Sequence, residues 1–487
     1  MIDAGVEDAE KDCTSMDMHE YAKYDAVGLR ALIEAGEVTA GEVEGAARAA
    51  LAAADAEVNG LALPPFDPAL DRAATGPLAG VPFLIKDHGP VAGGVPFTIG
   101  SRALPGIVAP HDSDLMARFR AAGLVTLGLT TVPEMALSFS TESVRYGPTR
   151  NPWDLDRGVG GSSGGAAALV AAGAVPVAHG SDGAGSIRIP ASCCGLVGLK
   201  PSRGRVPCGP DAGEPMLGMA YEFGLTRTVR DAAHLLDAVQ GPGVGDKYTA
   251  PSPRGRYAGE LGIEPGPLRV AVATEAWSGA AVDPQVAAAA VRVGRVLEGM
   301  GHAVTEDRPV LDWEDVMRCM TATAVAIGSM ILLAPRRPDP GKLEAVSRRL
   351  LEFAEGYGAL DMLAAFGAQN RVTRSAAAFL TGHDLLVTPT LGRLPAPHGT
   401  LRYDDPGHTV DSWLRTLFEY GPFTMVFNVS GQPAISLPLG WSDGGLPIGV
   451  QLVAPYGRED LLFRVAGVLE KAMPWAERTP GFSVGRR

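Results

Sequence analysis

The segment GVGGSSGGAAALVAAGAVPVAHGSDGAGSIRIP, residues 158–190, decides how the chain folds. It begins with a run of glycines and serines, continues as an alanine-rich stretch of helical composition, and reaches the apolar run VPVAHG, residues 175–180. A second loop of small residues, SDGAGS, follows at 181–186. This order of loop, helix, strand and loop predicts an α/β fold in which both loops meet at one edge of a sheet.

The same rhythm of helices and strands continues on both sides of this segment. On the N-terminal side, the patterns predict a helix from Asp25 that closes at Gly36, a second helix behind a Thr39–Glu42 capping box, and then a strand, a helix and a strand at 81–86, 114–122 and 124–130. On the C-terminal side, strands are predicted at 268–274, 384–390, 429–438 and 448–453, and helices at 230–240, from 283 to 301 and from about 460.

These elements predict the architecture of the whole chain. We expect one three-layer α/β/α domain with a large mixed central sheet, over residues 21–487. Residues 312–382 lack strand signals, so they are predicted to form a helical insertion. Residues 1–20 are acidic and are predicted to be a mobile N-terminal segment.

Composition and charge exclude several classes of protein. The 487 residues carry a formal net charge of −13 and contain no long basic run, which argues against binding to nucleic acid or to an anionic membrane. The five cysteines form no C-x-x-C pair, so we expect reduced thiols rather than disulfides. No signal peptide or membrane span is predicted, and we therefore expect a cytoplasmic protein.

Four interpretations compete for the glycine-rich loop at 158–165. A phosphate-binding P-loop fails because Ala166 and Ala167 stand where Lys and Ser or Thr are needed. A dinucleotide fingerprint is weak because Ser163 replaces its third glycine. The run 160–164 does match the G-x-S-x-G nucleophile elbow, which would predict an esterase with a Ser-His-Asp triad. A flexible Gly/Ser turn without function is the fourth interpretation.

The second loop favours a different arrangement of catalytic groups. It presents Ser186 after the small residues Gly183, Ala184 and Gly185, whose backbone N–H groups are open enough to form an oxyanion hole. We expect Asp182 and Arg188, on either side, to hold the shape of the loop through an ion pair and hydrogen bonds to the backbone.

A serine nucleophile needs a base, and Lys86 is the candidate. It ends the apolar strand VPFLIK, so its side chain is predicted to point from the sheet edge into a buried pocket. Burial disfavours the charged form of a lysine and lowers its pKa toward neutrality, where the amine can accept a proton.

The motifs PFLIKD, GGSSGG and SDGAGSIRIP, in this order, resemble those of the amidase signature family. The resemblance extends over most of the chain and includes RNPWDLDR at 150–157 and NVSGQPAISLPLG at 428–440. It implies a Ser–cisSer–Lys triad in which Ser186 is the nucleophile, Ser162 the bridging serine after a cis peptide bond from Gly161, and Lys86 the base. It also implies that residues 183–185 form the oxyanion hole and that Ser163 is an accessory hydrogen-bonding residue.

The implied activity is hydrolysis of a carboxylic amide through an acyl-serine intermediate, without metal or cofactor. Within the family, VAHGSDGAGS and PYGREDLL are most similar to the 6-aminohexanoate cyclic dimer hydrolases. We expect a small or medium uncharged amide, linear or cyclic, in a pocket lined from Met135 to Tyr146, with Met135, Ala136 and Phe139 as substrate contacts, and capped by the insertion.

Other functions stay open at this point. An amidotransferase subunit would share these motifs, and an inactive amidase-like binding protein or a nucleotide-binding module would use the same loops. The nine histidines show no H-E-x-x-H spacing, so no metal site is predicted. His88 occupies an unfamiliar place beside Lys86. A homodimer is the expected assembly.

Overall fold

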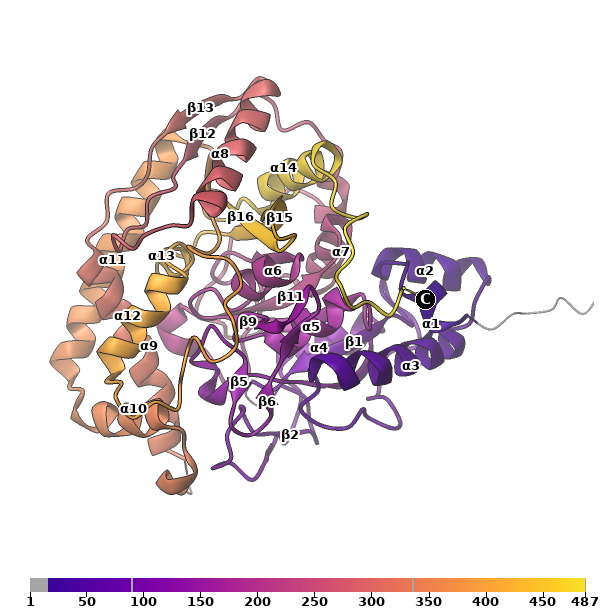
Figure 1. Ribbon diagram of the computed structural model, residues 1–487, viewed down its shortest axis with the longest axis horizontal. Coiled ribbons are helices and arrows are strands. Elements are labelled where there is room, and N and C mark those ends of the chain that lie inside the picture. Colours follow the sequence, from indigo (N-terminus) through magenta and orange to yellow (C-terminus); the bar gives the residue numbers. More distant parts are fainter. Residues whose placement is uncertain (1–15, 89–90, 335–336, 487) are drawn as a thin grey trace, which may run out of the picture.

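A mixed β-sheet forms the centre of the molecule (Figure 1). The computed structural model describes residues 16–88, 91–334 and 337–486, and among these the sheet has ten strands. From one edge to the other they are β13 (Ala303–Glu306), β12 (Arg269–Val272), β14 (Leu385–Pro389), β16 (Pro447–Val453), β15 (Ala434–Trp441), β10 (Val197–Lys200), β11 (Tyr221–Thr226), β9 (Val177–Asp182), β1 (Pro82–Lys86) and β4 (Val125–Thr130).

The directions of the strands confirm the predicted mixed sheet. β1 pairs in parallel with both β4 and β9, and β12 pairs in parallel with both β13 and β14. The strands between these two groups pair antiparallel. Because β1 and β9 run in parallel, their C-terminal ends, Lys86 and Asp182, lie at the same edge of the sheet.

Helices cover the sheet, so several of its strands, including the edge strand β4, are completely buried. Every residue of β1, β4 and β9 is buried, as expected when helices pack on either side of a sheet. Helices α5 and α7 both pack on β11. The helices of these layers are α3 (Ala40–Val58), α4 (Asp114–Ala121), α5 (Gly164–Ala171), α6 (Arg188–Cys194), α7 (Val229–Val239), α8 (Pro284–Gly299) and α14 (Glu459–Ala472).

The N-terminal helices follow the predicted capping signals. Helix α2 (Ala26–Ala35) has Asp25 as its N-cap and ends at Gly36, whose φ of 70° is left-handed. Thr39 and Glu42 form the predicted capping box at the start of α3. The predicted mobile segment, 1–20, falls mainly on residues 1–15, which lie outside the described residues; Met18–Tyr21 form the short helix α1.

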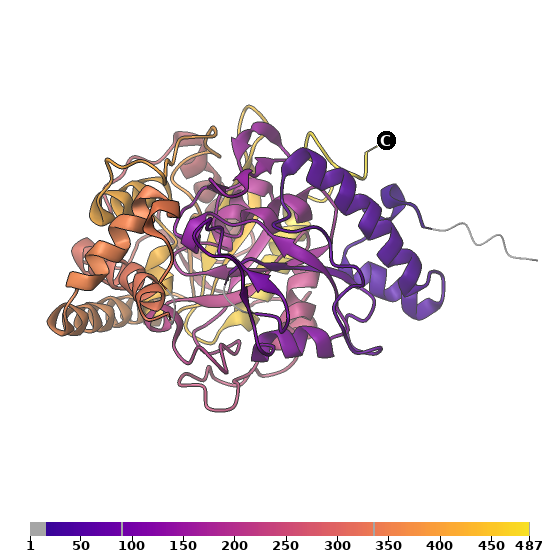
Figure 2. The same ribbon diagram turned by 90° about the horizontal axis from the view of Figure 1, so that it is seen from below.

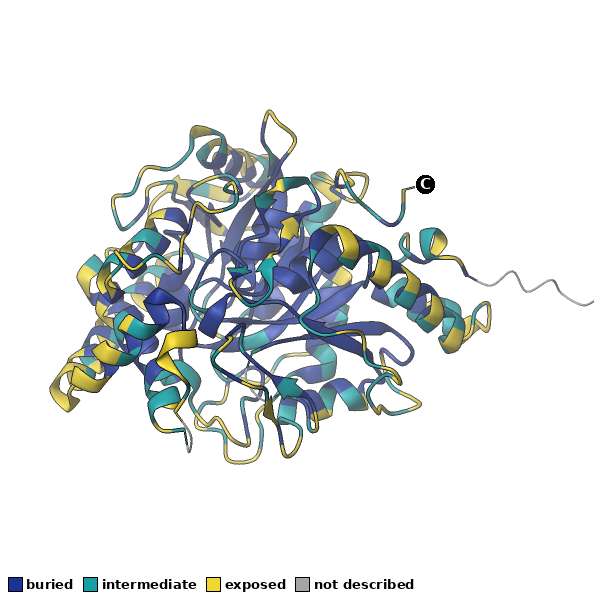
Figure 3. Cartoon of the chain, turned by 60° about the horizontal axis from the view of Figure 1, so that its bottom comes forward, coloured by how far each residue is buried: buried dark blue, intermediate teal, exposed yellow. Residues whose placement is uncertain are grey.

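Three helices occupy the stretch predicted as a helical insertion. They are α9 (Trp313–Leu332), α10 (Ala345–Gly356) and α11 (Ala359–Gly382), and α12 (Val410–Tyr420) packs against α9 and α10. These helices gather at one end of the molecule, opposite α2 and α3 (Figures 1 and 2). Their outer surfaces are exposed, whereas most of the sheet, apart from its edge strand β13, is buried (Figure 3).

Helix α9 is the one described helix long and apolar enough to cross a membrane. Of its most apolar window, 56% is buried inside the protein, where α9 packs on α10 and α11. Length and composition of a single helix are weak evidence for a membrane span, since the core helix of a soluble protein has the same properties.

The predicted strand at 429–438 begins later than its composition indicates. Residues Met425–Ser430 form the short helix α13, and β15 starts only at Ala434. Gly431, with a φ of 90°, ends the helix in a left-handed conformation that a β-branched residue rarely adopts. Strands β10 and β11, which pair antiparallel next to β9, were not predicted.

Small elements complete the chain around the sheet edge. They are the paired strands β2 (Pro96–Phe97) and β3 (Ile107–Val108), β5 (Glu142–Ser143) and β6 (Gly147–Pro148), and β7 (Arg150–Asn151) and β8 (Asp154–Gly158), with 3₁₀ turns at Glu134–Ala136, Pro215–Gly218, Tyr257–Glu260 and Pro340–Lys342.

Candidate active site

Lys86 lies at the end of β1 and is completely buried. Its Nζ donates hydrogen bonds to Ser162 Oγ and to Ser181 Oγ, each over 2.8 Å. A third contact joins Nζ to the backbone oxygen of Ser181 at 3.4 Å. The lysine therefore joins the glycine-rich loop to the end of β9.

The electrostatic environment of Lys86 favours the neutral amine. Burial lowers the pKa of Lys86 to about 7, and the negative charges of Glu222 and Asp182 oppose this shift without cancelling it. A substantial fraction of the side chain is consequently unprotonated near neutral pH, as a proton acceptor must be.

The glycines around Ser162 are required by the close approach of other backbone segments. The peptide bond between Gly161 and Ser162 is cis. A Cβ atom on Gly161 would lie 2.7 Å from the carbonyl oxygen of Ser138, and one on Gly165 would lie 2.4 Å from that of Gly60. No other residue type fits at these positions without moving the backbone.

Ser163 connects the two serine loops. Its Oγ donates to the backbone oxygen of Ser181 over 3.2 Å, and its backbone N–H donates to that of Ser186 over 3.2 Å. Because Ser163 is fully buried and committed to these bonds, it holds Ser162 and Ser186 at a fixed separation.

The loop 183–186 takes its shape from the buried pair Asp182 and Arg188. Arg188 Nη2 and Nε lie 2.8 and 2.9 Å from the two carboxylate oxygens of Asp182, and neither side chain is exposed. Asp182 also accepts the backbone N–H of Gly185 and that of Ile187. Burial raises the pKa of Asp182, but the charge and hydrogen bonds of Arg188 outweigh it and hold the pKa below its usual range.

These bonds determine which backbone N–H groups are available for the predicted oxyanion hole. The N–H of Gly185 is directed to Asp182 over 2.7 Å, so it is not free for a substrate. The N–H groups of Gly183, Ala184 and Ser186 donate to no acceptor among the described residues. The free donors are therefore those of residues 183, 184 and 186.

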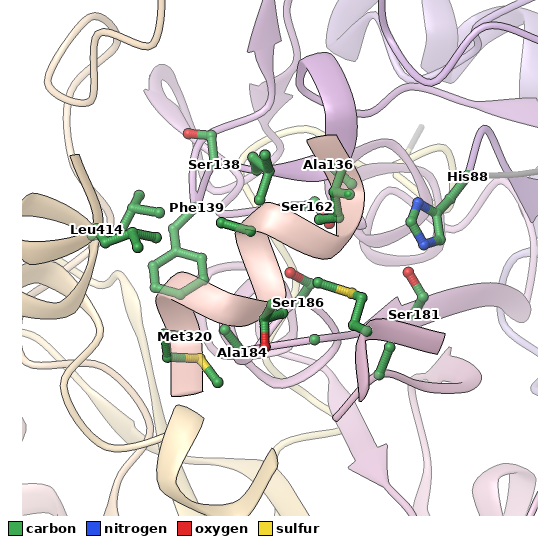
Figure 4. Close-up of a pocket in the computed structure, with 18 of the residues that line it drawn as sticks. His88, Ala136, Ser138, Phe139, Ser162, Ser181, Ala184, Ser186, Met320 and Leu414 are labelled. Carbon is green, nitrogen blue, oxygen red and sulfur yellow. The ribbon is translucent and has the colours of Figure 1, made fainter. Parts of the chain in front are cut away.

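Ser162 and Ser186 open into one cavity (Figure 4). Ala136 and Phe139 line it, as expected for this segment, but Met135 does not, and its side chain is buried in the protein. The other lining residues are His88, Leu137, Ser138, Ser181, Gly183, Ala184, Met216, Ala220, Met320, Thr323, Ala324, Ile327, Leu414, Leu417 and Phe418.

A family model for amidases matches residues 52–463. This chain belongs to the amidase family. The 6-aminohexanoate-cyclic-dimer hydrolase of Paenarthrobacter ureafaciens is 41% identical over 478 residues, which cover 94% of this amidase and 96% of that relative.

Solved structures agree with this membership. The structure of a 6-aminohexanoate cyclic dimer hydrolase has a TM-score of 0.88 and 39% sequence identity, and the match covers 95% of this amidase and 99% of that chain. A bacterial aryl acylamidase of the amidase signature enzymes has a TM-score of 0.84 and 26% identity, over 95% of this amidase and 99% of that chain.

The amidase contains two important residues that the sequence analysis did not assign. Ser181 receives a hydrogen bond from Lys86, and only the pairing of β1 with β9 could have placed it there. The buried carboxylate of Asp87 accepts the backbone N–H groups of residues 98, 99 and 100 and the hydroxyls of Thr98 and Tyr146, so it fixes the loop beside Lys86.

No histidine of the described chain is bonded to either serine, which argues against the Ser-His-Asp interpretation. His179 Nδ1 accepts the backbone N–H of Lys86 over 3.3 Å, and its Nε2 lies 2.7 Å from Glu222 Oε2. Both ring nitrogens of His179 are thus occupied away from the cavity.

A search for metal ligands in this amidase gave no candidate centre. Within residues 16–88, 91–334 and 337–486, no group of three or more His, Cys, Asp or Glu side chains is arranged to hold a metal ion. The described cysteines, Cys193, Cys194, Cys208 and Cys319, are free thiols, and Cys13 lies outside the described residues.

Proposed function

We propose that this amidase hydrolyses a small or medium uncharged carboxamide, linear or cyclic, through an acyl-enzyme on Ser186, with Ser162 and Lys86 as proton carriers. One observation carries the proposal. The buried Lys86 Nζ lies 2.8 Å from Ser162 Oγ, and Ser162 and Ser186 line the same cavity beside free backbone N–H groups.

In each half-reaction the relay moves one proton toward Lys86 and then one proton back. Neutral Lys86 accepts the proton of Ser162 as Ser162 accepts that of Ser186, and Ser186 Oγ attacks the amide carbon. Among the described residues no hydrogen bond joins the hydroxyls of Ser162 and Ser186, so Ser186 Oγ must turn toward Ser162 for this transfer. The N–H groups of residues 183, 184 and 186 stabilise the oxyanion.

The relay then runs in reverse. Ser162 protonates the leaving amine, Lys86 returns its proton to Ser162, and the carbon–nitrogen bond breaks to leave an ester on Ser186. In the second half-reaction a water molecule attacks this ester and gives one proton to Ser162, which passes its own proton to Lys86. The bond between the acyl carbon and Ser186 Oγ then breaks, Ser162 returns a proton to Ser186 Oγ, and Lys86 reprotonates Ser162, which releases the carboxylic acid. The overall reaction consumes one water for each amide bond.

The cavity supports an uncharged substrate. Phe139, Met320, Leu414 and Phe418 make most of one side apolar, and no Asp, Glu, Arg or Lys is among the lining residues of the described chain. A charged group there would lose its hydration without gaining an ion pair, which costs several kcal/mol. The relatives' substrate, cyclic 6-aminohexanoate dimer, is an uncharged amide and is the first compound to test.

We propose further that the enzyme acts in the cytoplasm, as a homodimer, without nucleic acid or membrane partners. The net charge of −13 supports the exclusion of polyanionic partners. The exposed leucines 360 and 363 on α11 supply apolar surface for a contact between subunits. Sedimentation equilibrium tests the assembly, and a monomer at micromolar concentration would contradict it.

Labelling with a fluorophosphonate probe, followed by peptide mapping, tests the nucleophile. We expect modification at Ser186, none in Ser186→Ala, and full labelling in Ser138→Ala, which removes a cavity hydroxyl outside the relay. A panel of amides then includes cyclic 6-aminohexanoate dimer, alkyl and aryl amides, and a polypeptide. Modification of Ser162 instead, or hydrolysis of the polypeptide alone, would contradict the proposal.

A further inference from the structure

The cavity has two chemically different sides (Figure 4). Phe139, Met320 and Leu414 form an apolar side. His88 and Ser181 lie on the other side, and the two reactive serines lie between. A substrate whose amide is attacked at Ser186 therefore extends toward both sides.

Most polar side chains of the cavity are already hydrogen-bonded. Ser162 and Ser181 accept hydrogen bonds from Lys86. Ser138 Oγ accepts the backbone N–H of Ser140 over 3.1 Å, and Thr323 Oγ1 donates to the backbone oxygen of Cys319 over 2.9 Å. The serine hydroxyls keep a free O–H, whereas His88 is the one polar side chain of the cavity, apart from Ser186, for which no side-chain hydrogen bond is present among the described residues.

The ring of His88 is held beside the site without a partner of its own. The backbone N–H of His88 donates to the Lys86 oxygen over 2.8 Å, which fixes the residue next to the base. Its Nδ1 is sealed from solvent and bonded to nothing among the described residues, and no hydrogen bond to Nε2 is present among them either. Because Nδ1 is sealed from solvent, a ligand in the cavity reaches the ring through Nε2.

His88 is neutral when the enzyme works. Burial lowers the pKa of His88 to about 4, the neighbouring Lys86 and His179 lower it further, and the carboxylates of Glu222 and Asp87 oppose them. A neutral imidazole offers one N–H donor and one nitrogen acceptor. It is suited to an amide, which also has one donor and one acceptor, and it offers no charge to a carboxylate.

We propose that His88 is a specificity residue that forms a hydrogen bond to a second uncharged polar group of the substrate, beyond the scissile amide. The preferred substrate class is then a compound with two carboxamides, one cleaved at Ser186 and one bound at His88. This proposal rests on the proposed function, since it names the substrate class of the same cavity. His88 positions the substrate and takes no part in the proton relay.

Two matched ligands distinguish a hydrogen bond from His88 from simple packing of its ring against the ligand. Cyclic 6-aminohexanoate dimer contains two amides, and the lactam of the same ring size with one amide has the same shape but lacks the second polar group. Binding of both to Ser186→Ala is measured by titration calorimetry, with and without His88→Leu or His88→Gln. The absence of the nucleophile keeps the ligands intact.

We expect His88→Leu to weaken binding of the dimer by about tenfold, the value of one hydrogen bond, and to change binding of the lactam less than about twofold. His88→Gln, which keeps a donor and an acceptor, restores most of the affinity for the dimer. In the enzyme with Ser186, the same replacements raise KM for the dimer more than they lower kcat.

Equal losses of affinity for both ligands in His88→Leu would show that His88 only packs against the ligand. Unchanged affinity for the dimer in His88→Leu would overturn the proposal. Failure of Ser186→Ala to bind either ligand would overturn it too. The proposed function fails by a separate result, namely hydrolysis of the dimer by Ser186→Ala at the rate of the unaltered enzyme. The two ideas are therefore tested by different measurements.

Discussion

Lys86 and Ser162 are joined by a hydrogen bond of 2.8 Å between Nζ and Oγ, at a depth where neither side chain is more than 1% exposed. An ammonium group in this position would lose its hydration, and no carboxylate is among its hydrogen-bond partners. The contact is therefore better suited to moving a proton than to stabilising the fold.

The replacement Lys86→Met separates these two roles. We expect kcat/KM for an amide substrate to fall at least about a thousandfold, because the relay loses its base. The free energy of unfolding should not fall, since an apolar side chain of similar length replaces a buried amine. Hydrolysis rates give kcat/KM, and urea unfolding gives the free energy of unfolding. Ser138→Ala is the control that keeps activity. Retained activity in Lys86→Met, together with a loss in His179→Ala, would restore the histidine-based alternative.

The pH dependence of hydrolysis follows from the lowered pKa of Lys86. Since burial brings this pKa to about 7 in the free enzyme and only the neutral amine accepts a proton, kcat/KM should rise with pH through about 7 and then level off on the alkaline side. A profile of kcat/KM from acid to alkaline pH, over the range in which the protein stays folded, measures this. A maximum near pH 5 is incompatible with Lys86 as the base.

Breaking the pair Asp182–Arg188 should damage both stability and catalysis. Arg188→Leu leaves the Asp182 carboxylate buried without its counter-ion, and we expect a loss of about 3–5 kcal/mol in the free energy of unfolding. Urea denaturation measures it. The control is Arg415→Ala, which removes an exposed pair with Glu314 and should cost no more than about 1 kcal/mol. Similar losses of unfolding free energy in the two variants would show that the buried pair stabilises the fold no more than the exposed pair does.

The contact between the helical insertion and the loop before the cavity should depend on pH. Glu134 accepts the backbone N–H of Glu344 at the start of α10, and Glu344 accepts that of Val144. Burial, with the nearby charges of Glu134 and Asp404, raises the pKa of Glu344 to about 8. Above about pH 4.3 Glu344 loses its proton in the unfolded state but keeps it in the folded state. The free energy of unfolding therefore falls as the pH rises from about 4.3 to about 8.

Glu344→Gln removes this dependence. We expect the variant to gain at least about 1 kcal/mol over the unaltered protein at pH 8.5 and little at pH 4. Melting curves at both pH values test it, with Glu352→Gln on the exposed side of α10 as the control. An equal change at both pH values would contradict the assigned pKa.

The sequence predicted those features that depend on neighbours in the chain. The capping residues of α2 and α3, the strand that ends at Lys86 and the two serine loops are all recognisable within a few residues of each other. The mixed sheet followed from the alternation of elements and is confirmed.

What could not be predicted depends on contacts between distant parts of the chain. Ser181 meets Lys86 because β1 and β9 are paired, and the sequence does not state which strands are neighbours. The N–H of Gly185 is occupied because the Asp182 side chain folds back onto the loop. Met135 has the composition of a substrate contact, but its side chain is buried in the protein and does not line the cavity.

One part of the cavity wall and the proposed catalytic groups come from separate stretches of the chain. Lys86, Ser162 and Ser186 lie within the first 188 residues, whereas Met320, Leu414 and their neighbours belong to α9 and α12. Mutations in the later part of the gene can therefore change which amide is accepted while the chemistry is inherited intact. Variation in these two helices is therefore one route to a new substrate.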